Sequence, residues 1–258
     1  MSSKEKYEYG MELYKQGRTI TSIAKELNIS RPRFSSFLKE NGFNPSNKKS
    51  VKSDIFEIID TEEKAYWLGF MYADGYVSSD RNSLGICLQL IDTPHLEKFK
   101  DFLKYSGDVR VESNRCRVEF RDTKMKNDLI EKGCTPKKSL TLTFPNEDIL
   151  PKELIRHFIR GYFDGDGCLC YTEKTLDVEL IGTQSFTETV CDIIGIDKKR
   201  IYPLGRGSEA KRIVMGGIKD IEKFLTYIYE DCHIYLDRKY DKYLKLKIAV
   251  FNRDIKND

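Results

Sequence analysis

The spacing of apolar residues alternates between a helical period and a strand period, and the same order of segments occurs twice. Over residues 84–90, apolar side chains alternate with small or polar ones, which predicts a half-buried strand. The other segments divide in the same way: 109–112, 115–121, 176–181, 198–202 and 211–215 are predicted strands, and 93–105, 185–194 and 218–229 are predicted helices. With an apolar helical segment opening each part, we expect an α+β fold of two pseudo-symmetric αββαββα halves, residues 54–145 and 146–258.

The first 53 residues follow a different pattern, with no strand-like alternation. Apolar spacing predicts a helix over 6–16, a second over 20–27, and a third that begins after Ser30. Two short helices around a tight turn resemble a helix-turn-helix module, so we expect residues 1–43 to form a small all-α DNA-binding domain. A small helical module that docks a protein is the alternative. The polar stretch 44–53, which contains Pro and Lys, is the predicted linker.

Two similar strings, WLGFMYADG at 67–75 and IRGYFDGDG at 159–167, open the two halves. Each contains an apolar helical body, two small residues four positions apart, and an Asp-Gly ending. The small residues, which let two helices approach backbone to backbone, are Gly69, Ala73, Gly161 and Gly165. The final aspartates, Asp74 and Asp166, lie 92 residues apart, which indicates a tandem duplication.

An aspartate at the end of a helix faces the negative end of the helix dipole, where a cation is preferred. A single Asp-Gly pair could be only a helix stop, since both residues favour turns. Paired helices, however, would bring Asp74 and Asp166 together, and the two like charges would repel each other unless metal ions lay between them. We therefore predict a composite site for a divalent cation.

The doubled string resembles the motif of the LAGLIDADG family of homing endonucleases and RNA maturases, and the resemblance covers roughly residues 54–250. The second copy matches the end of the motif closely, whereas the first has Tyr72 where the family often has an acid. The resemblance implies two sheets that form a saddle over DNA, with the motif helices as the seam between halves. It also implies that Asp74 and Asp166 are the metal-binding acids.

The resemblance further implies catalytic lysines late in each half. Lys138 in the string PKKS and Lys239 in LDRKY lie at the matching places, where such lysines polarise or order the attacking water. A solvated surface position is the alternative for each of them. Gln89, with Glu179 as its counterpart, is a weaker candidate for positioning water and metal, and Asp164 is expected to lie behind the metal ligands.

Phosphodiester hydrolysis needs an in-line water and stabilisation of the charge on the phosphoryl group, which divalent cations supply. Mg²⁺ or Mn²⁺ is the expected cofactor, because two aspartates with water and substrate oxygens are sufficient ligation. A zinc site is not expected, since three dispersed histidines and seven scattered cysteines show no ligand spacing. The cysteines indicate free thiols in a reducing compartment. No Ser/His/Asp set or glycine-rich phosphate loop is present, which disfavours acyl transfer and ATP-driven chemistry.

The net charge is only +3, but residues 1–53 contain eleven Lys/Arg against five Asp/Glu, so the basic character is concentrated there. On the predicted strand 115–121, three arginines and one glutamate share a face; a solvated sheet surface is the alternative to contact with a DNA groove. The candidate DNA-binding residues are Arg31, Arg33, Lys39, Lys48, Lys49, Arg115, Arg117, Arg121 and Lys211.

Taken together, these features predict a sequence-specific double-strand DNA endonuclease that depends on divalent metals held by paired aspartates. A monomer that reads a long asymmetric DNA target is expected, with intron RNA as a further partner and no membrane association. The alternatives are an RNA maturase that assists intron splicing and a non-catalytic DNA-binding transcription regulator. We expect the protein in the cytoplasm, or in an organellar matrix or nucleoid, and not in the secreted fraction, since no apolar run suits a bilayer or a secretion signal.

Overall fold

The computed structural model describes residues 2–16, 18, 20–43, 49–172, 175–205 and 207–251. The chain divides into two compact units, Met1–Lys49 and Ser50–Asp258, each with its own hydrophobic core. Within the described residues, none of the helices is both long and apolar enough to span a bilayer. All seven cysteines are free thiols, as the sequence predicted.

The smaller unit consists of three short helices: α1 (Ser3–Lys15), α2 (Ile20–Glu26) and α3 (Arg31–Glu40). Helix α1 begins before the predicted start at residue 6 because Ser2 and Glu5 form a capping box, in which each side chain accepts a hydrogen bond from the other residue's backbone N–H. All three helices contribute to the core, which consists of Leu13, Ile20, Ile23, Phe34 and Leu38.

The turn between α2 and α3 contains Asn28, whose φ of 47° lies in the left-handed region. Asparagine tolerates this conformation better than most residues with a side chain, because its short polar group hydrogen-bonds locally. Asn28 therefore takes the place that glycine commonly holds in a turn between two helices.

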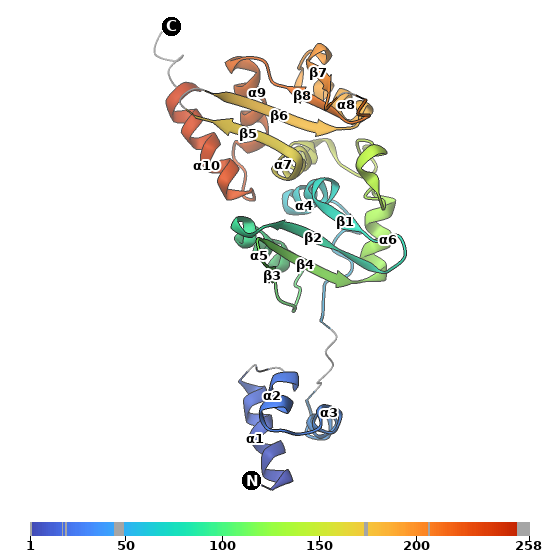
Figure 1. Ribbon diagram of the computed structural model, residues 1–258. Coiled ribbons are helices and arrows are strands. Elements are labelled where there is room, and N and C mark those ends of the chain that lie inside the picture. The colour runs from blue at the N-terminus through green and yellow to red at the C-terminus, as the bar shows by residue number, and fades with distance from the viewer. Residues whose placement is uncertain are drawn as a thin grey trace. The chain divides into compact units, whose positions relative to one another are not determined.

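The larger unit repeats one order of elements, helix-strand-strand-helix-strand-strand-helix (Figure 1). The first half contains α4 (Glu62–Ala73), β1 (Gly75–Val77), β2 (Ser83–Gln89), α5 (Thr93–Phe102), β3 (Arg110–Glu112), β4 (Arg115–Arg121) and α6 (Thr123–Glu131). The second contains α7 (Ile155–Asp166), β5 (Gly167–Tyr171), β6 (Leu176–Gly182), α8 (Gln184–Ile194), β7 (Ile201–Pro203), β8 (Lys211–Val214) and α9 (Ile218–Tyr229). Helix α10 (Asp237–Leu246) and a π-helical turn, η5 (Lys247–Phe251), follow. The predicted αββαββα plan is confirmed.

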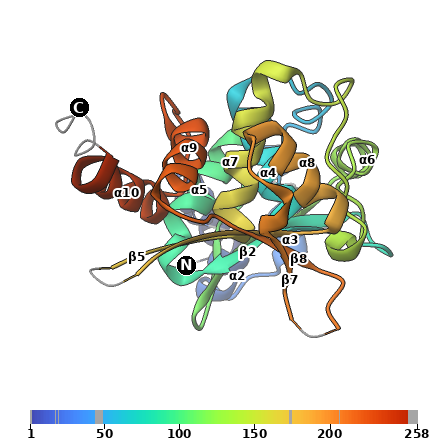
Figure 2. The same cartoon turned by 90° about the horizontal axis from the view of Figure 1, so that it is seen from above.

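Each half has a four-stranded antiparallel sheet, with strand orders β1-β2-β4-β3 and β5-β6-β8-β7. Figure 2 shows α4, α7, α8 and α9 on one side of the curved line of strands β5, β2 and β8. The alternation along β4 fits this arrangement, because Cys116, Val118 and Phe120 are buried while Arg115 and Arg121 are exposed.

At the boundary of two predicted strands the structure has a 3-10 turn where the sequence analysis placed strand residues. Leu90 was assigned to the strand over 84–90, but β2 ends at Gln89, and Leu90 opens the 3-10 turn η1 (Leu90–Asp92) with 44% of its surface exposed. Residues 198–200 were assigned to a strand and form a second 3-10 turn, η4 (Lys198–Arg200), before β7. Short 3-10 turns of this kind are common as connectors beside regular elements, and only the first of the two continues an apolar pattern.

Helices α4 and α7 lie side by side at the centre of the larger unit and form the seam between its halves (Figures 1 and 2). A Cβ built on Gly69 would overlap the carbonyl oxygen of Phe158 and lie 3.0 Å from the backbone nitrogen of Tyr162. A Cβ on Gly161 would likewise overlap the carbonyl of Tyr66 and lie 3.0 Å from the nitrogen of Phe70. Only glycine fits at either position, so the predicted close approach of the two backbones is confirmed.

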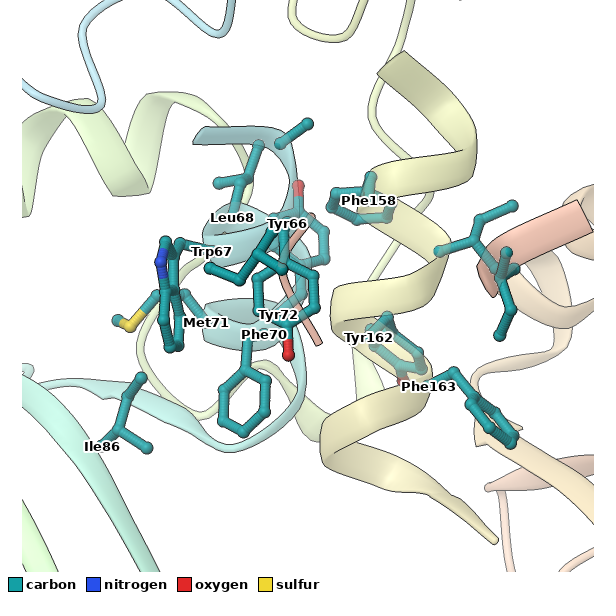
Figure 3. Packing of buried hydrophobic residues seen from close by; sticks show 14 of the residues in the cluster. Tyr66, Trp67, Leu68, Phe70, Met71, Tyr72, Ile86, Phe158, Tyr162 and Phe163 are labelled. Atoms are coloured by element: carbon teal, nitrogen blue, oxygen red, sulfur yellow. The ribbon is translucent and has the colours of Figure 1, made fainter. Parts of the chain in front are cut away.

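Aromatic side chains fill the space around this contact (Figure 3). Tyr66, Trp67 and Phe70 from α4 and Phe158 and Phe163 from α7 are buried in one continuous core that joins both halves. The seam is therefore a rigid, tightly packed element, and the ends of its two helices are held in a fixed relation.

Candidate active site at the end of the seam

The two motif aspartates lie at the same end of the helix pair. Asp74 caps the C-terminus of α4, and Asp166 is the last residue of α7. A Cβ built on Gly165, directly before Asp166, would lie 3.5 Å from Oδ2 of Asp74. The Asp74 carboxylate therefore crosses the seam and reaches the backbone next to Asp166, as the duplicated motif predicted.

Both carboxyl groups are harder to ionise than an ordinary aspartate. Burial raises the pKa of Asp166 to about 6, and the negative charge of Asp74 adds to the increase. Burial also raises the pKa of Asp74, although the charges of Lys239, Lys138 and Arg238 oppose the change. The Asp74 side chain still reaches solvent, so protein surrounds the pair but leaves it accessible. A cation bound between the two acids would relieve their repulsion.

Each motif helix ends against a buried lysine from its own half. Lys138, in the 3-10 turn η2 (Lys138–Leu140), donates from Nζ to the carbonyl oxygens of Ala73, at 3.3 Å, and Gly75. Lys239, in the first turn of α10, donates to the carbonyls of Phe163 at 2.5 Å, Asp164 at 3.0 Å and Gly167 at 2.5 Å. A lysine ammonium group thus donates to the carbonyls at the end of each motif helix, where the helix dipole favours positive charge.

The two lysines are 8% and 2% exposed, so the alternative of a solvated surface position is wrong for both. Burial lowers the pKa of Lys239 to about 8, partly offset by the charges of Asp164 and Asp74. Lys239 is the cation that acts most strongly on Asp74, and Lys138 the one that acts most strongly on Asp166. Both lysines lower the pKa of both aspartates, so the two halves contribute jointly to the electrostatics of the site.

Asp164 lies two residues before Asp166 on α7, behind the candidate ligands as expected, and is fully buried. Its carboxylate accepts hydrogen bonds from the hydroxyls of Tyr66, at 2.8 Å, and Tyr229, at 2.5 Å, and from the backbone N–H of Leu236, at 2.8 Å. Leu236 directly precedes α10. Asp164 thereby fixes the start of the helix that carries Lys239.

The donor set fits a hard divalent cation. Two carboxylates face each other, and the described residues contain no cluster of three or more His, Cys, Asp or Glu that would form a complete protein cage. Magnesium is commonly held by one or two carboxylates, with water and phosphate oxygens in the other positions, and manganese accepts the same oxygen donors. A structural zinc ion would need four nitrogen or sulfur ligands.

Gln89 and Glu179 are not counterparts, contrary to the sequence analysis. The glycine after each motif aspartate fixes the register of its hairpin: Gly75 pairs with Ile86, and Gly167 pairs with Leu180. Gln89 lies three residues after Ile86, whereas Glu179 lies one residue before Leu180. The register equates Gln89 with Thr183. Gln89 is exposed at the end of β2, and Glu179 forms an ion pair with Arg212 at 3.2 Å.

Of the candidate DNA-binding residues of the sheets, Arg115 and Arg121 lie on the helix-free face of β4, whereas Lys211 shares its face of β8 with the buried Ile213. Arg115 and Arg121 are exposed at the two ends of β4, and Lys211 is partly exposed at the start of β8. Arg117, between the two arginines, is held by Glu112 at 2.5 Å and lies 3.8 Å from Glu119. Its charge is therefore partly neutralised within the protein, which the alternation pattern did not indicate.

The basic residues predicted for the N-terminal unit are on the surface of α3 and after it. Arg31, Arg33 and Lys39 are exposed on α3, and Lys49 is exposed at the end of the unit. Lys48 lies outside the described residues. Three cations thus belong to one short helix of this unit.

Sequence reasoning missed a group of ion pairs that joins the first half to α10. Arg238 donates from Nε to both carboxylate oxygens of Asp92, at 2.9 and 3.3 Å. Lys98 on α5 binds the carboxylate of Asp237 at 2.6 Å and the carbonyl of Tyr235 at 3.2 Å. The only sequence signal was the charged string 237–239, because the partners are more than 130 residues away.

No family model matches the sequence, and no curated protein matches it either. The fold, in contrast, resembles solved structures at low identity. The LAGLIDADG homing endonuclease I-GzeII in complex with its DNA target has a TM-score of 0.51 and 13% identity, with 74% of this chain and 91% of that one covered. I-SmaMI, bound to an uncleaved DNA target in the presence of calcium ions, has a TM-score of 0.52 and 12% identity, with 76% of this chain and 93% of that one covered. The I-LtrWI LAGLIDADG homing endonuclease bound to target DNA has a TM-score of 0.51 and 11% identity, with 75% of this chain and 93% of that one covered. The chain thus has the fold of LAGLIDADG homing endonucleases.

Proposed function

We propose that the protein is a sequence-specific DNA endonuclease that hydrolyses both strands of a duplex with divalent metal ions bound by Asp74 and Asp166. The observation that carries the proposal is the pair of acids at the end of the seam, with a buried lysine against the carbonyls at the end of each motif helix. The structural neighbours, which are homing endonucleases crystallised with DNA targets, support the same substrate class.

The residues of the site divide the work of phosphodiester hydrolysis between them. Asp74 and Asp166 would hold Mg²⁺, which when bound lowers the pKa of its water and stabilises charge on the phosphoryl oxygens. Lys138 and Lys239 supply positive charge beside the acids and sit on backbone carbonyls, so their positions are fixed before DNA arrives. Lys239 is buried and donates to three carbonyls, so it acts as a fixed positive charge beside the acids, and burial lowers its pKa to about 8.

DNA would lie across the helix-free faces of the two sheets, with its axis over the end of the seam. Arg115 and Arg121, at the two ends of β4, offer side chains of the type that contacts phosphates and guanine edges, and Lys211 would reach DNA only past the edge of β8. The two sheets are unlike in sequence, so a single chain reads two different half-sites. The basic helix α3 of the N-terminal unit, with Arg31, Arg33 and Lys39, would extend the contact beyond them.

The test is cleavage by purified protein in Mg²⁺, first on a randomised duplex library and then on the joined sequences that flank the coding region. We expect double-strand breaks at one selected sequence. Asp74→Asn and Asp166→Asn should each abolish cleavage and leave DNA affinity largely intact, because the amide keeps the shape of the side chain but does not replace an anionic metal ligand.

The matched control is Asp148→Asn, which changes an exposed carboxylate outside the motif helices and should cut like the wild type. Cutting at the wild-type rate by either motif variant would contradict the metal assignment. Selective binding without any cleavage by the wild type would instead favour a regulator that binds DNA, and rescue of splicing of an intron RNA would favour a maturase.

A further inference from the structure

Asp92 and Thr183 each directly precede the helix that follows the second strand of their half, although the strand register aligns Thr183 with Gln89. Thr183 behaves as a normal helix cap: its Oγ1 accepts from the backbone N–H of Phe186 at 3.2 Å. Asp92 is also a preferred capping residue, but it makes no side-chain cap on α5. Its buried carboxylate, 6% exposed, is used for Arg238 instead.

The guanidinium of Arg238 is fixed at one end and accessible at the other. Nε donates to Asp92 at 2.9 and 3.3 Å, and 44% of the side chain is exposed. Neither Nη nitrogen makes a hydrogen bond to another residue in the part of the chain that the structure describes. Two Nη groups in a planar fork match the oxygens of a phosphate, and the Asp92 contact holds that fork in place.

Arg238 lies at the composite site and on one side of it. It directly precedes Lys239 in the first turn of α10, and its charge acts on the carboxyl group of Asp74. The segment that carries it is held by both halves, through Lys98 to Asp237 at 2.6 Å and through Asp164 to the N–H of Leu236 at 2.8 Å. The cation is therefore preorganised next to the acid pair, a condition under which a positive charge stabilises a transition state most.

The other side of the site has no such arrangement. The residue before Lys138 is Lys137, which adopts a left-handed φ of 58° and is exposed. Thr183, which directly precedes its helix as Asp92 does, donates its hydroxyl to the carbonyl of Leu142 at 2.5 Å and carries no charge to hold a cation. One side of the site thus has a guanidinium held by a buried carboxylate, and the other has an exposed lysine.

We propose that Arg238 is a phosphate-contacting catalytic residue that serves only the scissile phosphate on the Lys239 side, and that Asp92 is the residue that positions it. This inference rests on the proposed function and adds to it that the two strands are cut with unequal assistance. Loss of Arg238 therefore slows the cleavage of one strand and leaves a nicked duplex as an intermediate.

The experiment uses the full-length protein and the duplex selected by the wild type, labelled with a different dye at the 5′ end of each strand. Arg238→Ala should slow cleavage of one strand by about tenfold or more, while the rate on the other strand stays within about twofold. Asp92→Asn, which keeps the shape but loses the charge, should slow the same strand by a smaller factor. Arg238→Lys should lie between Arg238→Ala and the wild type, and it serves as the second variant if Arg238→Ala folds poorly.

Lys245→Ala is the control, because Lys245 is an exposed cation on the same helix, and both strand rates should stay at the wild-type level. Equal slowing of both strands by Arg238→Ala, or by Asp92→Asn, would show a structural role and overturn the proposal. Unchanged rates with Arg238→Ala would overturn it as well. A wild-type protein that cuts no DNA would contradict the proposed function itself, an outcome distinct from wild-type cutting that Arg238→Ala does not alter.

Discussion

An ionised Asp166 opposes folding when no cation is bound, and the structure gives the size of the effect. The pKa of Asp166 rises from its ordinary value of 3.8 to about 6, because of burial and the charge of Asp74. Between these two values the folded protein binds more protons than the unfolded chain, so the free energy of unfolding falls as pH rises through this window. The full effect at neutral pH is about 3 kcal/mol, and partial solvent access of the side chain reduces the expectation to about 1–3 kcal/mol.

The perturbation is Asp166→Asn, and the assay is urea unfolding in the presence of a chelator. The fluorescence of Trp67, the only tryptophan of the chain, reports on the larger unit because Trp67 is fully buried in α4. At about pH 7.5 the variant should be more stable than the wild type by about 1–3 kcal/mol, since its amide carries no charge to repel Asp74. At about pH 4 the difference should largely disappear, because the wild-type carboxyl is then protonated.

Saturating Mg²⁺ at neutral pH should make the wild type more stable than Asp166→Asn. A cation that binds only the folded wild type raises its free energy of unfolding by about 2.7 kcal/mol at a hundred times the dissociation constant, and the variant lacks one of the two ligands. Asp148→Asn, a change at an exposed carboxylate, serves as the control for removal of one negative charge. A variant less stable than the wild type at neutral pH without metal, or a difference independent of pH, would refute the reasoning about the acid pair.

Two further predictions concern the N-terminal unit and the seam. Deletion of residues 1–45 should weaken DNA binding and lower the salt dependence of the affinity between about 50 and 200 mM salt, measured by fluorescence anisotropy, more than it slows cleavage of bound target; equal affinity would favour a protein-docking role for this unit. Gly161→Ala should lower the free energy of unfolding by about 3 kcal/mol, because its Cβ would overlap the Tyr66 carbonyl, whereas Gly205→Ala, with no atom within 4 Å of the new Cβ, should change it by less than about 0.5 kcal/mol. Equal effects of the two glycine changes would show that the helices can separate at no cost.

The fold was predictable from the sequence because local residue patterns indicate each element, and the same order of patterns occurs in both halves. The period of two along β4 and β6 and the Asp-Gly endings at Asp74 and Asp166 each indicate an element, and their repetition fixes the order of both halves. Errors occurred where a short 3-10 turn continued an apolar pattern, as at Leu90, or where a cap decided a boundary, as at Ser2. Such features depend on single hydrogen bonds, which periodicity does not encode.

The site was predictable only in part, because its members are related through the register and through distant side chains. The aspartates and lysines were found, but the burial of Lys138 and Lys239 against carbonyls depends on where two separate turns meet the helix ends. Gln89 was matched with Glu179 because both lie in the second strand, yet the two hairpins differ in length and shift that register. The contact of Asp92 with Arg238 spans 146 residues and has no counterpart in the other half from which it could have been inferred.

The seam itself has diverged into a polar side and an apolar side, and this asymmetry makes the halves specific for each other. On one side Tyr66 donates to Asp164, and Glu62 binds Arg160 at 2.7 Å; both Arg160 and Asp164 are buried. The other side is formed by Tyr72, 92 positions before Asp164, and Phe158, 92 positions after Tyr66. There the ring of Tyr72 packs edge-on against that of Phe158, with 5.0 Å between the ring centres.

Pairing of two second halves would place Asp164 against Phe158 and would remove Glu62 from Arg160. A buried charge that loses its partner costs several kcal/mol, which would disfavour this pairing relative to the native one. The two halves therefore fit each other better than copies of themselves, which is a physical basis for a single chain in which the two sides of the candidate site differ, as Arg238 and Lys137 do.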